Sequence, residues 1–301
     1  MIRNHALPWI ALLIFGAGWG AMQPANKVVV EAGFEPFGIM VWQGVITLLL
    51  AGAFVWRRGA PRGKHQWMLC AQIAILGTMI PHFATFTAVM HLPAGLMAII
   101  LSTIPIFALA MGLVTGREVL TWRLALGLCL GLMAITLIAA SRGELTAGAV
   151  WAVLLGLAAP LCYATNSTLI AGRGLAGLHP LQAFAGAAMI FLPVSIVVAY
   201  FTGQLRVLDM DLASTALIGT AVAHTLIYAG FLWLVAQAGA VFASQTAYLV
   251  TGFGIIWSML FLGERYGVDV WVALVMMFIG LSLVRPTTKP VAHSGVTNEI
   301  E

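Results

Sequence analysis

Charged residues are scarce in this sequence. Its 301 residues include 14 Lys and Arg and 10 Asp and Glu, so that 8% are charged while 61% are apolar. A soluble domain keeps about a quarter of its residues charged, and a chain of this length folded in water has too little interior to bury so many apolar side chains. The composition therefore excludes a water-soluble globular protein and predicts an integral membrane protein.

Cysteine is also rare. Cys70, Cys129 and Cys162 each lie inside an apolar stretch, where a thiol behaves as a small hydrophobic group. The sequence contains neither a disulfide framework nor a Cys and His pattern typical of a metal site, and it has no phosphate-binding G-x-x-x-x-G-K-[ST] loop. We therefore expect no metal and no other cofactor, and no ATP hydrolysis by this chain.

The few charges fall in short clusters that separate long apolar stretches. Each stretch has roughly the ~20 residues that a helix needs to cross ~30 Å of hydrocarbon, and none alternates as a strand of a membrane β-barrel would. The sequence predicts an all-α polytopic protein with ten transmembrane helices, at about residues 8–28, 37–56, 66–89, 93–115, 119–140, 147–170, 180–202, 212–236, 238–262 and 267–285.

The positions of the basic residues predict the orientation. With both termini in the cytoplasm, the outer side carries Lys27, Arg142, Arg206 and Arg265. The inner side then holds ten of the 14 basic residues, as the positive-inside rule requires, namely Arg3, Arg57, Arg58, Arg62, Lys64, Arg117, Arg123, Arg173, Arg285 and Lys289. These charges are dispersed rather than gathered on one face or motif, which excludes a nucleic-acid partner. The first apolar segment is too long for a signal peptide and is expected to stay in the mature chain.

The two halves of the chain resemble each other at an offset of about 142 to 149 residues. GTMIPH at 77–82 matches GTAVAH at 219–224, and TGREVLTW at 115–122 matches LGERYGVDVW at 262–271. A repeat of five helices, an odd number, inserts its second copy upside down, and inverted repeats are typical of alternating-access transporters. We expect one repeat over 1–145, an inverted repeat over 146–286 and a disordered tail over 287–301. A duplicated bundle without a transport role is the alternative.

These features resemble the EamA-type carriers of the drug/metabolite transporter superfamily. The resemblance rests on the ten-helix plan, on GAGWGAMQPA at 16–25 and on the charged turn before a Gly-rich last helix in each half. It implies a bacterial inner-membrane exporter of amino acids, other metabolites or toxic compounds. It also implies that helices one to four and six to nine surround a central cavity, braced by the fifth and tenth. Unlike the small multidrug-resistance branch, this first helix has no embedded glutamate.

Polar groups at hydrocarbon depth usually face the bundle interior or a watery cavity. In the first helix, Trp19, Gln23 and Asn26 share one face, and Pro24 frees a backbone carbonyl beside them. We expect these three residues to line a substrate cavity. The alternative is that this face serves close helix packing through the G-x-x-x-G pair Gly16 and Gly20.

His82 and His224 occupy equivalent positions in the two repeats, so a pseudo-twofold axis places them symmetrically about the centre. An imidazole can anchor a substrate or relay a proton; the alternative is a structural histidine hydrogen-bonded inside the bundle. Other amides and aromatic residues on the same stripes complete the predicted cavity, namely Phe86, Tyr163, Asn166, Tyr228, Gln245 and Tyr248.

Glu118 and Glu264 lie in repeat-equivalent turns, beside Arg117 and Arg265. They are candidates for gate salt bridges that break as the halves move. The alternative is acidic charge at a helix start, which the helix dipole favours.

The sequence therefore predicts a secondary transporter that exports small organic metabolites such as amino acids by alternating access. A multidrug efflux carrier is the alternative, and a channel or intramembrane enzyme is more remote. We expect no enzymatic activity, because no H-E-x-x-H motif, embedded carboxylate pair or activated nucleophile is present. The partners are a small-molecule substrate and the lipid bilayer. The chain is a monomer or a homodimer, and Gly127 and Gly131 on the fifth helix leave a dimer open.

Overall fold

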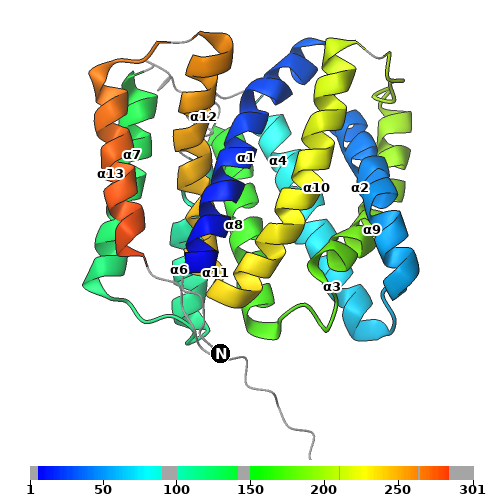
Figure 1. The fold of residues 1–301 in the computed structure, drawn as a ribbon, viewed down its shortest axis with the longest axis horizontal. Helices are drawn as coiled ribbons and strands as arrows, with labels where there is room; N and C mark the ends of the chain where they lie inside the picture. Colours follow the sequence, from blue (N-terminus) through cyan, green and yellow to red (C-terminus); the bar gives the residue numbers. More distant parts are fainter. Residues whose placement is uncertain (1–5, 90–99, 142–149, 210, 264, 285–301) are drawn as a thin grey trace, which may run out of the picture.

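The computed structural model describes residues 6–89, 100–141, 150–209, 211–263 and 265–284, and Figure 1 shows their arrangement. Every regular element in these ranges is helical, as the long apolar runs predict, because a backbone in lipid satisfies its own hydrogen bonds. Residues 75–79 form a π-helical segment that joins α3 to α4. The α-helices are α1 (Ala6–Glu31), α2 (Pro36–Arg58), α3 (Lys64–Ala74), α4 (Ile80–Val89), α6 (Ile104–Val114), α7 (Trp122–Ser141), α8 (Val150–Arg173), α9 (Pro180–Phe201), α10 (Leu212–Ala238), α11 (Ala240–Ser244), α12 (Thr246–Leu262) and α13 (Val268–Leu283).

The helices form a polytopic membrane protein. Six helical stretches of the described chain are long and apolar enough to cross a bilayer, namely 6–31, 64–85, 151–173, 180–201, 212–238 and 240–261. Shorter apolar helices occupy the other predicted positions. The all-α prediction is therefore confirmed for the described residues, and the count of ten spans stays a prediction. Residues 287–301, predicted to be disordered, lie outside the described residues.

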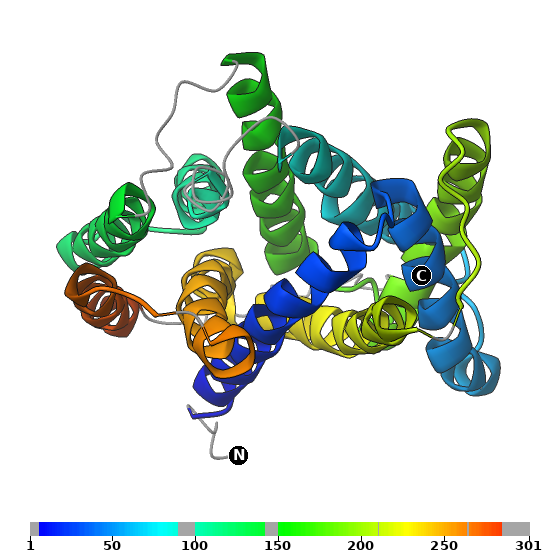
Figure 2. The ribbon, with the colours of Figure 1, turned by 90° about the horizontal axis from the view of Figure 1, so that it is seen from above.

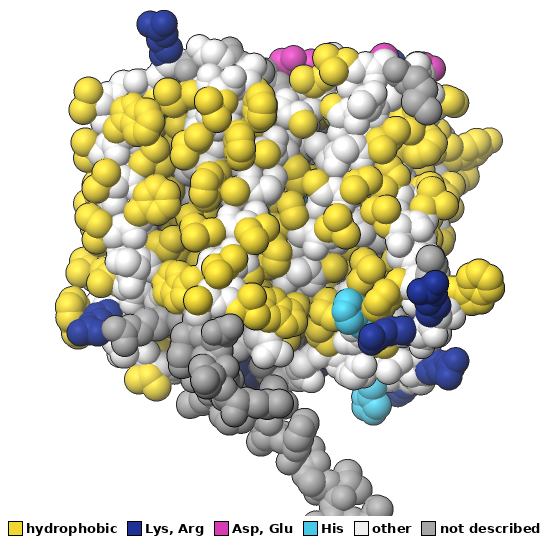
Figure 3. Space-filling model, viewed as in Figure 1, with side chains coloured by type: hydrophobic (Ala, Val, Ile, Leu, Met, Phe, Trp, Pro, Cys, Tyr) yellow, Lys and Arg dark blue, Asp and Glu magenta, His cyan; other side chains and the backbone are white. Residues whose placement is uncertain are grey.

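The surface has the polarity of a membrane protein. In Figure 3 a broad belt of apolar side chains covers the visible face. Most of the visible Lys and Arg side chains gather at the end of the bundle where α1 begins, and acidic side chains appear at the other end. The first end includes the C-terminal arginines of α2, Arg57 and Arg58.

Two helices at the polar ends begin with defined caps. The Asp211 carboxylate accepts a hydrogen bond from the Ser214 backbone N–H at 2.7 Å and so caps α10. This bond, which favours the ionised form, holds the pKa of Asp211 below its usual value. His179 caps α9 in a reciprocal arrangement with Gln182. These caps satisfy backbone donors at helix starts.

The helix contacts repeat in pairs across the two halves. If α1 corresponds to α8, α10 to the α3–α4 unit and α12 to α6, then the α1 contacts with α10 and α12 match the α8 contacts with α4 and α6. The contact of α2 with α10 likewise matches that of α9 with α3. Two further contacts, α2 with α9 and α7 with α13, each join a helix to its equivalent in the other half. The packing therefore has a pseudo-twofold axis that passes through the α2–α9 and α7–α13 contacts (Figure 2).

The matched helices α1 and α8 end at different faces of the bundle. The C-terminal end of α1 lies beside the C-terminal end of α9, where the Arg206 guanidinium donates to the carbonyl of Ala32. The C-terminal end of α8 leads instead into the start of α9, and there the Gln66 amide donates to the carbonyl of Ala176 at 3.2 Å. Because the 22 residues of α9 extend ~33 Å, equivalent helices α1 and α8 end at opposite faces.

The fifth and tenth predicted helices, α7 and α13, pack against each other along one edge of the molecule (Figure 1). A Cβ on Gly127 would lie 2.7 Å from the carbonyl oxygen of Gly280, and a Cβ on Gly280 would lie 2.7 Å from that of Gly127. Gly131 is covered by the ring of Tyr248. Gly127 and Gly131 therefore serve packing within the chain, and the expectation that these two glycines are free for a dimer contact is wrong. A homodimer through other residues stays a prediction.

The glycines of α1 bring it close to α12. A Cβ on Gly20 would lie 2.9 Å from the backbone nitrogen of Gly254 and 2.9 Å from Cβ of Phe253. Beside this contact the Trp257 indole donates to the carbonyl of Ala17 at 2.9 Å. The G-x-x-x-G pair therefore packs helices, and it does so on one side of α1 while Trp19 faces α10 on another.

We expect Gly20→Ala to lower the free energy of unfolding by about 1–3 kcal/mol, because backbone atoms of α12 must move to admit the methyl group. Gly52→Ala is the matched control: Gly52 lies inside α2, and a Cβ there would meet nothing within 4 Å. Thermal unfolding of both variants in the same detergent checks this. Equal melting temperatures for the two variants would show that the α1–α12 approach contributes nothing to stability.

Candidate functional site

Aromatic side chains from four helices meet near the middle of the bundle. The ring centroid of His224 on α10 lies 6.0 Å from that of His82 on α4, 5.5 Å from that of Tyr228 and 5.9 Å from that of Phe184 on α9. Trp19 on α1 lies 6.1 Å from His224 and 6.3 Å from Tyr228. We call these five residues the central cluster. The repeat-equivalent histidines thus face each other across the two halves.

A hydrogen bond ties the cluster together between the repeats. The Trp19 indole Nε1–H donates to Nδ1 of His224 at 3.3 Å. A neutral imidazole that accepts at Nδ1 carries its proton on Nε2 and presents that N–H as a donor. Trp19 therefore fixes both the orientation and the tautomer of His224.

A second set of hydrogen bonds extends from Tyr228 into the first half. The Asn166 amide on α8 donates to the Tyr228 hydroxyl at 3.4 Å, and the Gln72 amide on α3 donates to Oδ1 of Asn166 at 3.0 Å. The Tyr228 hydroxyl in turn donates to the carbonyl of Gly77 at 3.4 Å. Gly77 lies in the π-helical segment, where the carbonyl spacing differs from that of an α-helix. The tyrosine therefore stabilises a local break in the third predicted helix.

The two copies of the G-T-x-x-x-H motif differ in their surroundings. A Cβ on Gly77 would lie 2.1 Å from the Tyr228 hydroxyl oxygen, whereas a Cβ on Gly219 would meet nothing within 4 Å. Thr220 bonds to the carbonyl of Leu217 at 3.0 Å. The buried hydroxyl oxygen of Thr78 has no hydrogen-bond partner among the described residues. The polar face of the site therefore lies on the first copy of the motif.

The fourth predicted helix of each half is interrupted at an equivalent place. A turn at Ser102 and Thr103 precedes α6, and a turn at Gln245 separates α11 from α12. The Thr103 hydroxyl bonds to the carbonyl of Ile100 at 2.6 Å, and the Ser244 hydroxyl bonds to that of Val241 at 2.8 Å. Hydroxyl groups thus satisfy carbonyls near both breaks, as broken helices at membrane depth require.

Two other predicted cavity residues, Tyr248 and Gln245, make their hydrogen bonds outside the central cluster. Tyr248 packs between α7 and α13, and its hydroxyl donates to the carbonyl of Leu128 at 3.3 Å. Gln245 is fully buried at the break before α12; its amide donates to the carbonyl of Val241 at 3.2 Å, and its own Oε1 has no partner among the described residues. Asn26 is half-buried farther along α1, and Tyr163 is half-buried on α8 one turn before Asn166.

Three of the predicted site residues lie wholly or partly outside the described part of the chain. The side chains of Gln23 and Phe86 and the whole of Glu264 are outside the described residues. Glu118 is described, and its side chain covers Gly112 at the end of α6. The predictions of a gate at Glu118 and Glu264 and of a cavity contact for Gln23 and Phe86 therefore stay predictions.

Two residues of this region, Gln72 and Phe184, were not among the predicted site residues. Gln72 is an amide inside the apolar run LCAQIAIL at 69–76, so its polarity at membrane depth was a usable signal. Phe184 is one of 15 phenylalanines in an apolar chain and carries no such signal. Only its place on α9 beside α10 brings it against Tyr228, at a centroid distance of 4.6 Å.

Two helical halves that meet at a polar and aromatic cluster are an arrangement found in many membrane transporters. The family model of the EamA-like transporter family matches residues 7–140 and again residues 150–285. The chain therefore belongs to the EamA-like transporter family, a family of transporters rather than enzymes, within the drug/metabolite transporter superfamily.

The structural comparison agrees on the fold. A solved structure described only as "Crystal structure of protein" is similar to this chain with a TM-score of 0.77 at 14% sequence identity. The similarity covers 93% of this chain and 98% of that chain. No curated protein matches the sequence. At this level of identity the likeness shows the fold alone.

We expect Gly77→Ala to lower the melting temperature, because its methyl group would displace the Tyr228 hydroxyl, whereas Gly219→Ala should behave as the wild type. Tyr228→Phe removes the atom in conflict, so Gly77→Ala should cost less in a Tyr228→Phe background, and a double-mutant cycle by thermal unfolding measures this coupling. Additive effects of the two substitutions would show that the hydroxyl does not occupy this place.

Proposed function

We propose that this chain is a secondary carrier that exports small organic metabolites, amino acids among them, across the inner membrane by alternating access. The central cluster is the proposed substrate site. In this scheme the repeats are 1–145 and 146–286, both termini are cytoplasmic in accord with the positive-inside rule, and the tail at 287–301 is dispensable for transport.

The observation that carries the proposal is the meeting of His82 and His224. These equivalent residues come from opposite repeats, and their rings lie 6.0 Å apart. In carriers built from inverted repeats, the substrate site lies at the repeat interface near the middle of the bilayer. His224 is the thirteenth of the 27 residues of α10, and Trp19 is the fourteenth of the 26 of α1.

The chemistry of the cluster favours a neutral or zwitterionic substrate with apolar or aromatic character. None of the five cluster residues is acidic, and neither are Gln72 and Asn166, which bond to the cluster. Indole, phenol and phenyl rings offer apolar contact, while imidazole and amide groups offer a few directed hydrogen bonds, a mixture typical of small-molecule sites. The buried hydroxyls of Thr78 and Thr85 lie on the same stretch of chain as His82 and have no partner among the described residues.

The aromatic rings also support a second candidate, a multidrug efflux carrier for lipophilic cations. Trp and Tyr faces attract cations without any carboxylate, and Trp19 and Tyr228 lie side by side at 6.3 Å. A neutral cluster holds a cation less firmly than a site with an acidic side chain, which is why we place this candidate second.

Transport requires the cluster to open, because its side chains are in ring contact and Tyr228 is 4% exposed. The bonds from Trp19 to His224 and from Tyr228 to the carbonyl of Gly77 link opposite repeats and would have to break. In our scheme a substrate replaces them with bonds of its own. The π-helical segment and the two interrupted helices supply places where the halves can bend.

We expect Trp19→Phe to slow substrate counterflow by about two- to tenfold, because it removes the N–H that positions His224 and a hydrogen bond of this kind contributes ~0.5–1.5 kcal/mol. Trp9→Phe is the matched control: Trp9 is on the same helix but packs edge-on against Phe242 at 4.8 Å, away from the cluster. Proteoliposomes loaded with unlabelled aromatic or neutral amino acids, selected first by a thermal-shift screen, measure the uptake of the labelled compound.

Counterflow limited to lipophilic cations would contradict metabolite export and support the efflux candidate. Flux that neither saturates nor shows counterflow would contradict a carrier altogether. Equal rates for the Trp19→Phe and Trp9→Phe variants would move the substrate site away from the central cluster.

A further inference from the structure

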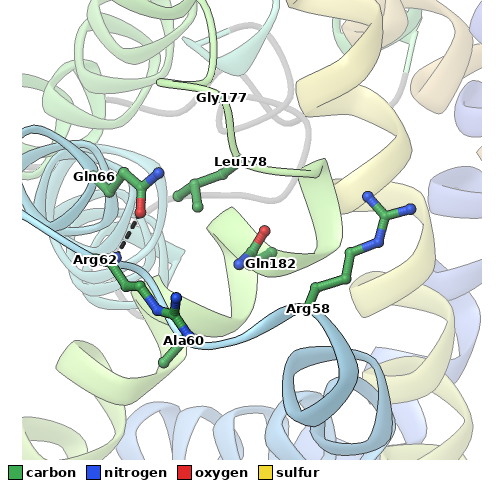
Figure 4. A pocket seen from close by; sticks show the side chains of 7 residues that line it. All are labelled: Arg58, Ala60, Arg62, Gln66, Gly177, Leu178 and Gln182. Carbon is green, nitrogen blue, oxygen red and sulfur yellow. Dashed lines mark hydrogen bonds between the residues drawn. The ribbon is translucent and has the colours of Figure 1, made fainter.

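A pocket of about 400 Å³ lies at the basic end of the bundle, far from the central cluster. It is formed where α2 ends, where α3 begins and where the turn between α8 and α9 passes. Figure 4 shows Arg58 and Arg62 on either side of Gln182. Its described lining contains two arginines, Arg58 and Arg62, and no acidic residue. The other lining residues are Ala60, Gln66, Gly177, Leu178 and Gln182.

Neighbouring rings position Arg58. Its guanidinium carbon lies 5.1 Å from the centroid of the Phe54 ring, one turn earlier on α2. The ring centroid of His179 lies 4.6 Å from that of the same Phe54. Partial burial and then the positive charge of Arg58 lower the pKa of His179, so this side of the pocket is kept cationic by arginine alone. A guanidinium stacked on an aromatic ring loses little freedom when it binds an anion.

The side chains of the two glutamines in the lining are hydrogen-bonded to backbone groups of the pocket. The Gln182 amide donates to the carbonyl of Gly59 at 2.6 Å, and the Gln66 amide donates to the carbonyl of Ala176 at 3.2 Å. Gln66 also accepts from the Arg62 backbone N–H at 2.5 Å, the bond drawn in Figure 4. These bonds join the α2–α3 turn to the α8–α9 turn. They leave the Arg58 and Arg62 guanidiniums as the donors that a ligand would meet.

Neither guanidinium has a carboxylate partner within the described residues. The described acids Glu35, Asp209 and Asp211 lie near the opposite end of the bundle, where α2 and α10 begin. Glu118 covers Gly112 at the end of α6 and is not part of the described lining. Two arginines facing one pocket repel each other unless an anion lies between them, and a phosphate fits the planar fork of each guanidinium. The pocket therefore has the positive charge and the guanidinium donors that a phosphate ligand uses.

The position of the pocket indicates which phosphate it meets. It lies at helix ends, and large apolar side chains beside it face outward: Trp56 is 89% exposed, and Leu49 on α2 and Met68 on α3 are 73% and 53% exposed. Tryptophan at such a level is typical of the interface between hydrocarbon and headgroups. Basic pockets between transmembrane helices at this level suit the headgroups of anionic lipids.

We propose that this pocket binds the phosphate of an anionic phospholipid, with Arg58 and Arg62 as its ligands and with the acyl chains along the outward faces of α2 and α3. The site joins the end of the second helix of one repeat to the start of the second helix of the other. Bound lipid would therefore stabilise the α2–α9 side of the molecule, independently of what the carrier transports.

The test measures lipid binding to the purified full-length protein. Short-chain phosphatidylglycerol, short-chain phosphatidylethanolamine and inorganic phosphate are titrated separately by native mass spectrometry and by thermal shift. We expect phosphatidylglycerol to bind and to raise the melting temperature. In the double variant Arg58→Gln with Arg62→Gln its affinity should fall about tenfold or more, since each basic residue near the surface contributes appreciably to anionic-lipid binding. The charge-matched control is Arg57→Gln with Lys64→Gln, which removes two neighbouring positive charges outside the described lining and should change the affinity less than about threefold.

Each other outcome would overturn the proposal. Equal losses in both double variants would show general surface charge instead of a site. Binding of inorganic phosphate as tight as that of phosphatidylglycerol would assign the pocket to a soluble anion, and equal binding of phosphatidylethanolamine would remove the requirement for net negative charge. Helix content by circular dichroism, compared between both variants and the wild type, identifies a loss that comes from misfolding. In that case Arg58→Lys with Arg62→Lys keeps the charge but not the fork, and an affinity unchanged from the wild type would contradict guanidinium recognition.

Discussion

In hydrocarbon each backbone N–H and C=O must find a partner inside the protein, and the rest of this structure depends on that constraint. It makes every described regular element a helix, and it confines departures from α-helical geometry to places where other groups can satisfy the freed carbonyls. The Tyr228 hydroxyl bonds to Gly77 in the π-helical segment, and the hydroxyls of Thr103 and Ser244 bond to carbonyls beside the interrupted helices. Most of the bundle is regular helix, and the irregular backbone lies where hydroxyl groups can bond to the freed carbonyls.

Symmetry organises the scaffold, and departures from symmetry make the site. Gly127 and Gly280 approach each other reciprocally, which is what a twofold axis through α7 and α13 requires. Near the centre, however, His224 accepts a bond from Trp19, and Gly77 is covered by Tyr228 while its counterpart Gly219 is open. Two identical halves would offer a ligand two identical faces. If the central cluster binds the substrate, as we propose, the divergence of the two copies would allow one end of an asymmetric molecule to be distinguished from the other.

Much of this architecture could be predicted from the sequence, because it depends on signals that survive in one dimension. The length of the apolar stretches and the clustering of charges predicted the helices. The paired G-T-x-x-x-H motifs predicted that His82 and His224 lie symmetrically about the centre, since equivalent residues of a repeat are related by its axis. A polar stripe on one helix does not say which neighbour it faces. Tyr248 shares a stripe with Gln245, yet it packs toward α7 and α13. For the same reason the sequence left Gly127 and Gly131 open to a dimer contact, although Gly280 and the Tyr248 ring cover them within the chain. Phe184 lies at the centre without any signal in the sequence.

In the functions that we propose, the distribution of charge separates two kinds of recognition in one molecule. A charged side chain at the bilayer centre is costly, whereas the same side chain at a helix end reaches the headgroup region. The described central cluster accordingly uses neutral rings and amides, and the arginines stay at the ends. A neutral site discriminates by hydrogen-bond geometry and shape, because a substrate that fails to satisfy buried donors and acceptors leaves them unpaired. Release from such a site is also easier than from a buried ion pair, in which separating the charges leaves each of them uncompensated. A carrier must release what it binds, so the absence of charge in the described cluster is itself consistent with alternating access.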